Sequence, residues 1–248
     1  MYSTRDLTLS IEYRIYQLMA QRGWVFSETA VAMTAITGDN IPANSYTAAS
    51  IMQPWYFFDN SILNTSRSKV VIYRNGTVLN PTAYTVDFRH GRISFPAHAS
   101  GTITADITHF AAEVREGYPQ DEELSMATLP IAAFNIEGKQ PKPFAVGSAT
   151  DLNTYPLTID LLCENDGQRK DLADDILDGI RAIPLLEMAG HSFLLPNNDI
   201  NPDFNYTSQM LGFANVFGRN ARTLEPRTGG LDKERFRSML TASVKSIS

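Results

Sequence analysis

Residues 70–95 alternate between short apolar runs and turn residues. The turns fall at Asn75-Gly76, Asn80-Pro81 and His90-Gly91. Asn-Gly suits a type I′ hairpin, because both central residues of that turn need a positive φ, which Gly adopts freely and Asn tolerates. A period of two continues through residues 102–110, where apolar and polar side chains alternate. The pattern therefore predicts a compact β-meander closed by a half-buried strand.

Two other stretches repeat their apolar residues at helical spacing. The first helix carries the stripe Leu7, Ile11, Ile15, Leu18 and Met19. Thr8 or Ser10 is its expected N-cap, and Gly23 its expected end. The second helix begins at Asp166 and presents the apolar face Leu172, Ile176, Ile180 and Ile183. Pro184 is expected to stop it, because proline removes a helical hydrogen bond.

The second half of the chain also predicts strands. Residues 129–136 and 157–163 are apolar runs separated by a loop that contains Pro and Gly. Residues 206–217 predict another strand, followed by a polar arm over 218–230 that we expect to be a flexible loop. The segment from Phe236 fits either a helix or one face of a strand, and its poor helix formers favour the strand.

These elements predict an α+β fold in which an antiparallel sheet is backed by two helices. Residues 1–23 and 113–248 would form the core, and residues 24–112 an inserted region with a small all-β meander domain at about 60–110. Such an insertion is tolerated where its two ends lie close together. We expect the two helices to pack together on one sheet, because neither can bury its stripe alone.

Composition narrows the classes of function. The chain has 248 residues, of which 43% are hydrophobic, and its formal net charge is −6. The negative charge argues against nucleic acid or an anionic membrane as the main partner of the whole surface. A single cysteine excludes an intrachain disulfide and a cysteine-based zinc site. No segment has the apolar length of a signal peptide core or a membrane span, so we expect neither.

A search for catalytic chemistry finds no motif that outweighs an ordinary structural role. Phosphate-binding glycine loops, G-x-S-x-G and H-E-x-x-H are all absent from the sequence. Possible metal ligands lie on turns and strands without ligand-like spacing, and we interpret them as surface residues: His90, His98, His109, Asp87 and Asp106. Cys163 ends an apolar strand and predicts a buried thiol rather than a nucleophile. We therefore expect no enzyme activity, no cofactor and no metal.

Two charged stretches are candidate interface surfaces. The second helix carries Asp171, Asp174, Asp175 and Asp178 on a face away from its apolar residues. The polar arm carries Arg219, Arg222 and Arg227, whose guanidinium groups can bind a carboxylate or a phosphate bidentately. The aromatic run over residues 55–58 is interpreted as core rather than as a ligand platform.

Two stretches resemble structural proteins of tailed-bacteriophage virions. "YRNGTVLNPTAYTVDFRHGRISF" resembles a β module of these viruses, with a strand, Asn-Gly, Tyr-x-Val-Asp, a Gly turn and Ile-x-Phe. "TLPIAAFNIEG" and "FAVGSATDLNTYPLTIDLLCENDGQRKDLADDIL" resemble the core of their neck and tail-terminator proteins. The matching helix start comprises Glu164, Asn165, Gln168, Asp171, Leu172 and Ala173.

The resemblance implies a virion protein that closes a homo-oligomeric ring, six-fold or twelve-fold, between the head connector and the tail. DNA would pass through the lumen, and the inserted β module would face other virion proteins such as a collar, a sheath or a tube. The alternative is a baseplate or adhesin module that binds host glycan through the meander and the aromatic run. A third hypothesis is an enzyme such as a hydrolase, but the search for catalytic motifs found none that supports it.

Overall fold

The computed structural model describes residues 4–39, 41–58, 70–143, 151–187, 208–225 and 236–247. Within this part the chain divides into two compact units. Unit 1 contains the described residues of 1–22, 112–191 and 205–248, and unit 2 contains those of 23–111.

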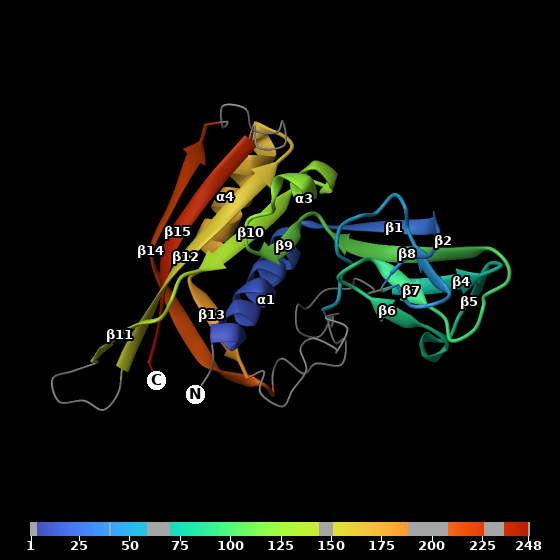
Figure 1. Ribbon diagram of the computed structural model, residues 1–248, viewed down its shortest axis with the longest axis horizontal. Coiled ribbons are helices and arrows are strands. Elements are labelled where there is room, and N and C mark those ends of the chain that lie inside the picture. The colour runs from blue at the N-terminus through green and yellow to red at the C-terminus, as the bar shows by residue number, and fades with distance from the viewer. Residues whose placement is uncertain are drawn as a thin grey trace. The chain divides into compact units, whose positions relative to one another are not determined.

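Unit 1 is built on a seven-stranded sheet in the order β13-β14-β15-β12-β10-β9, with β11 paired to one end of β12 (Figure 1). Its strands are β9 (Glu113–Glu116), β10 (Ile131–Ile136), β11 (Gln140–Pro143), β12 (Asp151–Cys163), β13 (Ala182–Leu186), β14 (Met210–Leu224) and β15 (Phe236–Ile247). Neighbouring strands are antiparallel except β9 and β10, which run parallel. The sheet curves as a half-barrel.

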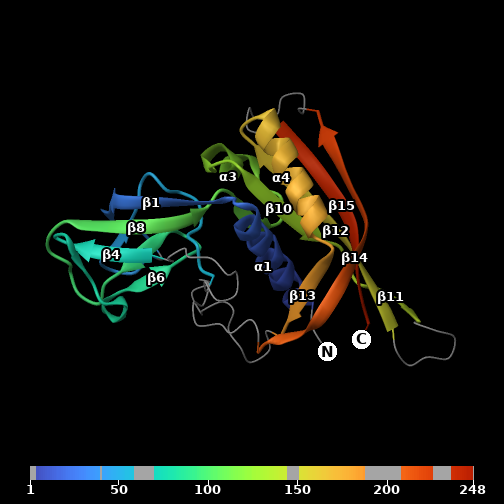
Figure 2. The ribbon, with the colours of Figure 1, turned by 180° about the vertical axis from the view of Figure 1, so that it is seen from behind.

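Helices α1 (Thr4–Arg22) and α4 (Asp166–Gly179) pack against each other and against this sheet. Helix α4 contacts β12, β14 and β15, whereas α1 contacts β13 and β9 (Figures 1 and 2). The two helices approach so closely that a side chain at Gly179 would collide with Leu18. The predicted packing of the first helix against the second is therefore confirmed.

Each of the two helices differs from the sequence prediction at one end, α1 at its start and α4 at its end. Helix α1 begins at Thr4, and the Ser10 hydroxyl donates to the Asp6 carbonyl within the helix instead of capping it. Gly23 ends the helix with φ +87°, as predicted. Helix α4 ends at Gly179, before Pro184, and Ile183 belongs to strand β13. At its start, the Asn165 side chain accepts a hydrogen bond from the Gln168 amide.

A third, short helix, α3 (Asp121–Met126), covers part of the other face of the sheet. Its Leu124 packs against Ile131, Ala133 and Leu162 in a small buried cluster.

Unit 2 contains two four-stranded sheets, in the orders β1-β8-β4-β5 and β2-β3-β7-β6. The strands are β1 (Val25–Ala32), β2 (Thr34–Ile36), β3 (Ser45–Thr47), β4 (Val70–Arg74), β5 (Thr77–Val78), β6 (Thr85–Asp87), β7 (Arg92–Ser94) and β8 (Ile103–Phe110). Between the two hairpins lies the 3₁₀ turn η1 (Pro81–Ala83). The aromatic run is buried as predicted, and Tyr56, Phe57 and Phe58 all pack against Phe110.

The predicted fold class, an α+β fold with an antiparallel sheet backed by two helices and a small inserted meander, is wrong. Among the described residues, strands make up 48% and helices 21%, and the strands form three sheets. The segment predicted as one meander is divided, because the β4–β5 hairpin pairs with β8 while the β6–β7 hairpin pairs with β3. Strands β1, β2 and β3, from a region for which the sequence analysis predicted no strand, complete the two sheets.

The predicted flexible arm over residues 218–230 is also wrong in its first part. Strand β14 continues to Leu224, where it pairs with Arg237 of β15. Residues 226–230 lie outside the described part of the chain. The final segment is a strand, as favoured from its composition.

Candidate assembly surface

The interpretation of the possible metal ligands in unit 2 as surface residues is wrong for Asp87 and His109, which are buried. The Asp87 carboxylate lies 2.8 Å from His90 Nδ1 and 2.6 Å from Arg92 Nε, and it also accepts the His90 amide in a tight turn. Among the described residues, no group of three or more His, Cys, Asp or Glu side chains is placed to hold a metal ion.

Asp106 stabilises a bulge in the edge strand β1. Its carboxylate accepts hydrogen bonds from the Ala30 amide at 2.8 Å and from the Tyr73 hydroxyl at 2.6 Å. The bond to Asp106 raises the pKa of the Tyr73 hydroxyl. Ala30 has φ +54°, and the pairing of β1 with β8 shifts register beside it. Such a bulge protects an edge strand from pairing with another chain.

Cys163 is buried at the end of β12. Burial raises the pKa of its thiol to about 12, which keeps the sulfur protonated at neutral pH. The prediction that Cys163 is a buried thiol is therefore confirmed.

Three of the exposed strand edges in unit 1 are blocked by local chemistry. The Tyr16 hydroxyl bonds both the amide and the carbonyl of Val114 in β9, at 3.1 and 3.3 Å. In β13, Pro184 has no N–H to offer and the Leu186 amide donates to Ser10 Oγ at 3.0 Å. Strand β11 has the sequence QPKP, in which prolines alternate with a lysine.

In the described chain, no proline or side-chain hydrogen bond covers the edge of strand β14 over its second half. The strand does bulge there, because its pairing with β15 shifts register between Phe217 and Asn220, beside Gly218 at φ +59°. Strand β13 covers only residues 210–215 of β14, whereas residues 217–224 pair with β15 on one side. No strand of the described chain pairs with residues 217–224 on the other side. An unpaired edge of this kind is a ready template for another chain.

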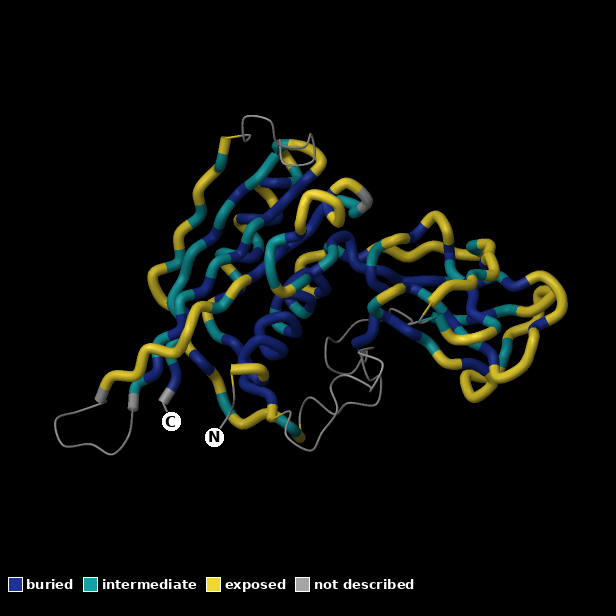
Figure 3. Tube along the Cα trace, in the orientation of Figure 1, coloured by how far each residue is buried: buried dark blue, intermediate teal, exposed yellow. Residues whose placement is uncertain are grey.

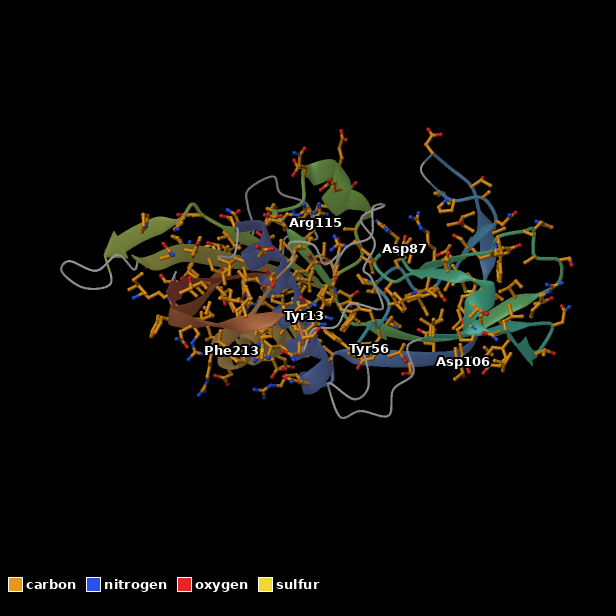
Figure 4. The ribbon with its side chains drawn as sticks, turned by 90° about the horizontal axis from the view of Figure 1, so that it is seen from below. Tyr13, Tyr56, Asp87, Asp106, Arg115 and Phe213 are labelled. Atoms are coloured by element: carbon orange, nitrogen blue, oxygen red, sulfur yellow. The ribbon has the colours of Figure 1, made fainter. Side chains whose placement is uncertain are left out.

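The same strand exposes large apolar side chains. Alternation along β14 buries Ala214 and Val216, which share the face that α4 covers. Leu211, Phe213 and Phe217 point the other way and are 51%, 59% and 49% exposed. The recurring exposed residues are visible along β14 in Figure 3, and Figure 4 labels Phe213 on this strand.

Two cations share this face of the sheet. Lys245 of β15 lies opposite Asn215 of β14, and its ammonium nitrogen is 5.0 Å from the centre of the Phe217 ring. Arg222 is exposed and lies opposite Met239, whose sulfur it approaches at 3.9 Å. We call the exposed group the β14 patch, and it comprises Leu211, Phe213, Phe217, Arg222 and Lys245.

The three predicted interface arginines fall in different places. Arg219 points to the opposite face, where its guanidinium donates to the Leu177 carbonyl of α4 at 2.5 Å. It stabilises its own protomer, because this carbonyl lies in the last turn of the helix. Arg222 belongs to the β14 patch, and Arg227 lies outside the described residues.

The predicted acidic face of α4 is only partly solvent-facing. Asp171, Asp174 and Asp178 are exposed, and no ion-pair partner for their carboxylates occurs in the described part of the chain. Asp175 is 3.6 Å from Arg22 of α1 and joins the two helices. We call the three exposed aspartates the acidic stripe.

The apolar members of the β14 patch were missed in the sequence. Their signal is present, because residues 211–217 read Leu-Gly-Phe-Ala-Asn-Val-Phe, with apolar side chains on both faces of a strand. A strand with a single buried face shows strict alternation, so apolar residues on both faces indicate a second contact.

Searches against protein-family models, curated proteins and solved structures find no match to this chain. None of the described helices is both long enough and apolar enough to cross a membrane.

Proposed function

We propose that this protein is a structural virion component of a tailed bacteriophage. It acts as a neck or tail-terminator protein that assembles into a homo-oligomeric ring between the head connector and the tail. In this proposal the protein is localised in the virion. The resemblance of residues 73–95 and 128–177 to such proteins first suggested this function, and the surface of unit 1 supports the assembly step.

The observation that carries the proposal is the character of β14. One strand combines an unpaired edge with three large, half-exposed apolar side chains. Monomeric proteins block their strand edges and keep exposed apolar side chains scattered. The other edges of this sheet follow that rule, through Tyr16, Pro184 and the prolines of β11.

Different edges on the two sides of a sheet favour a directional contact between copies. The β9 edge is closed by Tyr16, whereas the β14 edge is open in the described chain. A surface that is not self-complementary joins copies head to tail, and such contacts close into rings when the rotation per subunit allows it.

The charge of the protein suits a channel for DNA. Each protomer carries a formal net charge of −6. A negative wall makes few attractive contacts with phosphates, so DNA can move past it without being held.

The alternative function, glycan binding by an adhesin, loses its main support. Trp55, Tyr56 and Phe57 have at most 1% of their surface exposed, so the aromatic run offers no platform to a sugar.

Electron microscopy of the purified full-length chain tests the proposal. Closed rings of one subunit number, with six-fold symmetry favoured, are the expected result. Particles of single protomers at every concentration would contradict it.

A further inference from the structure

The two faces of the unit 1 sheet carry opposite charges. Side chains of α4 line one face, where Leu177 and Ile180 border a small cavity with Leu240 and Ala242 of β15. Lys245 and Arg222 belong to the other face, because they alternate with Val244 and Ala221 along their strands. The acidic stripe and the β14 patch therefore lie on opposite sides of one layer.

Within the described residues, neither group of charges is neutralised. Arg222 and Lys245 have no carboxylate partner in the described residues, and Lys245 stands over the Phe217 ring instead. The carboxylates of Asp171, Asp174 and Asp178 likewise pair with no cation in that part of the chain. The described part of each protomer thus carries two cations on one side and three anions on the other that have no ion-pair partner within it.

Contact between two β14 patches is unfavourable. A two-fold interface repeats the same surface on both partners, so Arg222 and Lys245 would approach the same cations of the second copy. Like charges brought together as water leaves an interface cost several kcal/mol. The patch needs a partner surface that is acidic.

We propose that the β14 patch of one protomer docks on the acidic stripe of α4 in a second copy of this chain. This inference rests on the proposed ring function and names the two surfaces that form its subunit contact. Arg222 and Lys245 pair with the neighbour's aspartates, while Phe213 and Phe217 beside them exclude water. The loss of water strengthens each ion pair, because the local dielectric constant falls.

The opposite placement of the two surfaces explains why the contact continues from copy to copy. A protomer that has used its β14 patch still presents its acidic stripe, and the reverse is also true. Assembly therefore proceeds head to tail and stops when a ring closes.

Mixing of two charge-reversed variants tests the contact. The patch variant is Arg222→Glu with Lys245→Glu, and the stripe variant is Asp171→Lys with Asp174→Lys. Each alone should assemble about 100-fold more weakly than the wild type, because its ion pairs become repulsive. In their equimolar mixture every contact between unlike copies joins opposite charges, wild-type at one contact and reversed at the next, so native mass spectrometry should show oligomers with equal numbers of the two variants.

Lys139→Glu with Lys142→Glu is the matched control for the patch variant, since it lowers the net charge by the same amount at two exposed lysines outside both surfaces. This control should assemble like the wild type. Circular dichroism should report the same fold for all variants, because the reversed side chains lie on the surface.

Two results would overturn the inference while leaving the ring function intact. In one, the wild type forms rings and both variants assemble equally well. In the other, only the patch variant fails to assemble and mixing restores no association, which indicates a different acceptor surface. A wild-type chain that never associates would instead contradict the ring function itself.

Discussion

At the residue scale, Ser10 bonds strand β13 to helix α1, and Arg219 bonds strand β14 to helix α4. The left-handed turns at Gly23 and Gly76 follow from glycine's lack of a Cβ and could be predicted. The partners of Ser10 and Arg219 could not, because each bonds a group far away in sequence, at Leu186 and Leu177. Arg219 therefore stabilises helix α4 of its own protomer, although its charge made it an interface candidate.

Cys163 provides a prediction at this scale. Its folded pKa of about 12 lies above the ordinary thiol value of about 8.5. A raised folded pKa contributes stability that is fully present below the ordinary value and is lost as the pH rises towards the folded value. We expect unfolding free energy to fall above about pH 9, and to fall less in Cys163→Ala.

Thiol alkylation measures the same burial directly. At about pH 8, iodoacetamide should label Cys163 quickly in denaturant and at least about 100-fold more slowly in the folded protein, because the reactive thiolate is scarce and covered. Equal rates in the two states would refute the burial of this side chain.

At the element scale, long periodic segments were predictable and the sheet to which each strand belongs was not. Strands β10 and β12 contain apolar runs that the sequence marks clearly, whereas the segment of β15 fitted either a helix or a strand. The division of residues 70–95 between two sheets depends on pairing with β3 and β8, which are distant along the chain. Local alternation is the same in either arrangement, so it cannot decide between one meander and two hairpins.

Excision of unit 2 tests this arrangement. Its two ends meet, because the Ala111 amide donates to the Trp24 carbonyl at 2.9 Å. We expect a chain that joins residue 22 to residue 112 through a short Gly/Ser linker to keep unit 1 folded, with one cooperative thermal transition.

The comparison variant joins residue 59 to residue 113. It removes β8, β4 and β7, so β1 loses the strand with which it pairs and β3 keeps only β2, and we therefore expect aggregation. A folded 59–113 chain together with an aggregated 22–112 chain would contradict the unit boundaries.

At the scale of the whole molecule, the central claim is that copies of this chain associate through β14. The acidic stripe could be predicted from helical spacing, whereas the β14 patch needed the structure, because only the pairing of β14 shows which of its faces α4 covers. Burial of Phe213 and Phe217 would supply the apolar part of the contact, at about 25 cal/mol per Å² of surface removed from water.

The most direct measurement is sedimentation velocity of the full-length chain beside the variant Phe213→Ser with Phe217→Ser. The control is Val78→Ser, which changes a 57% exposed apolar residue in unit 2. We predict that the wild type and the control sediment as one closed oligomer and that the double variant sediments as a folded monomer. A wild-type monomer, or a double variant that assembles like the wild type, would contradict the account.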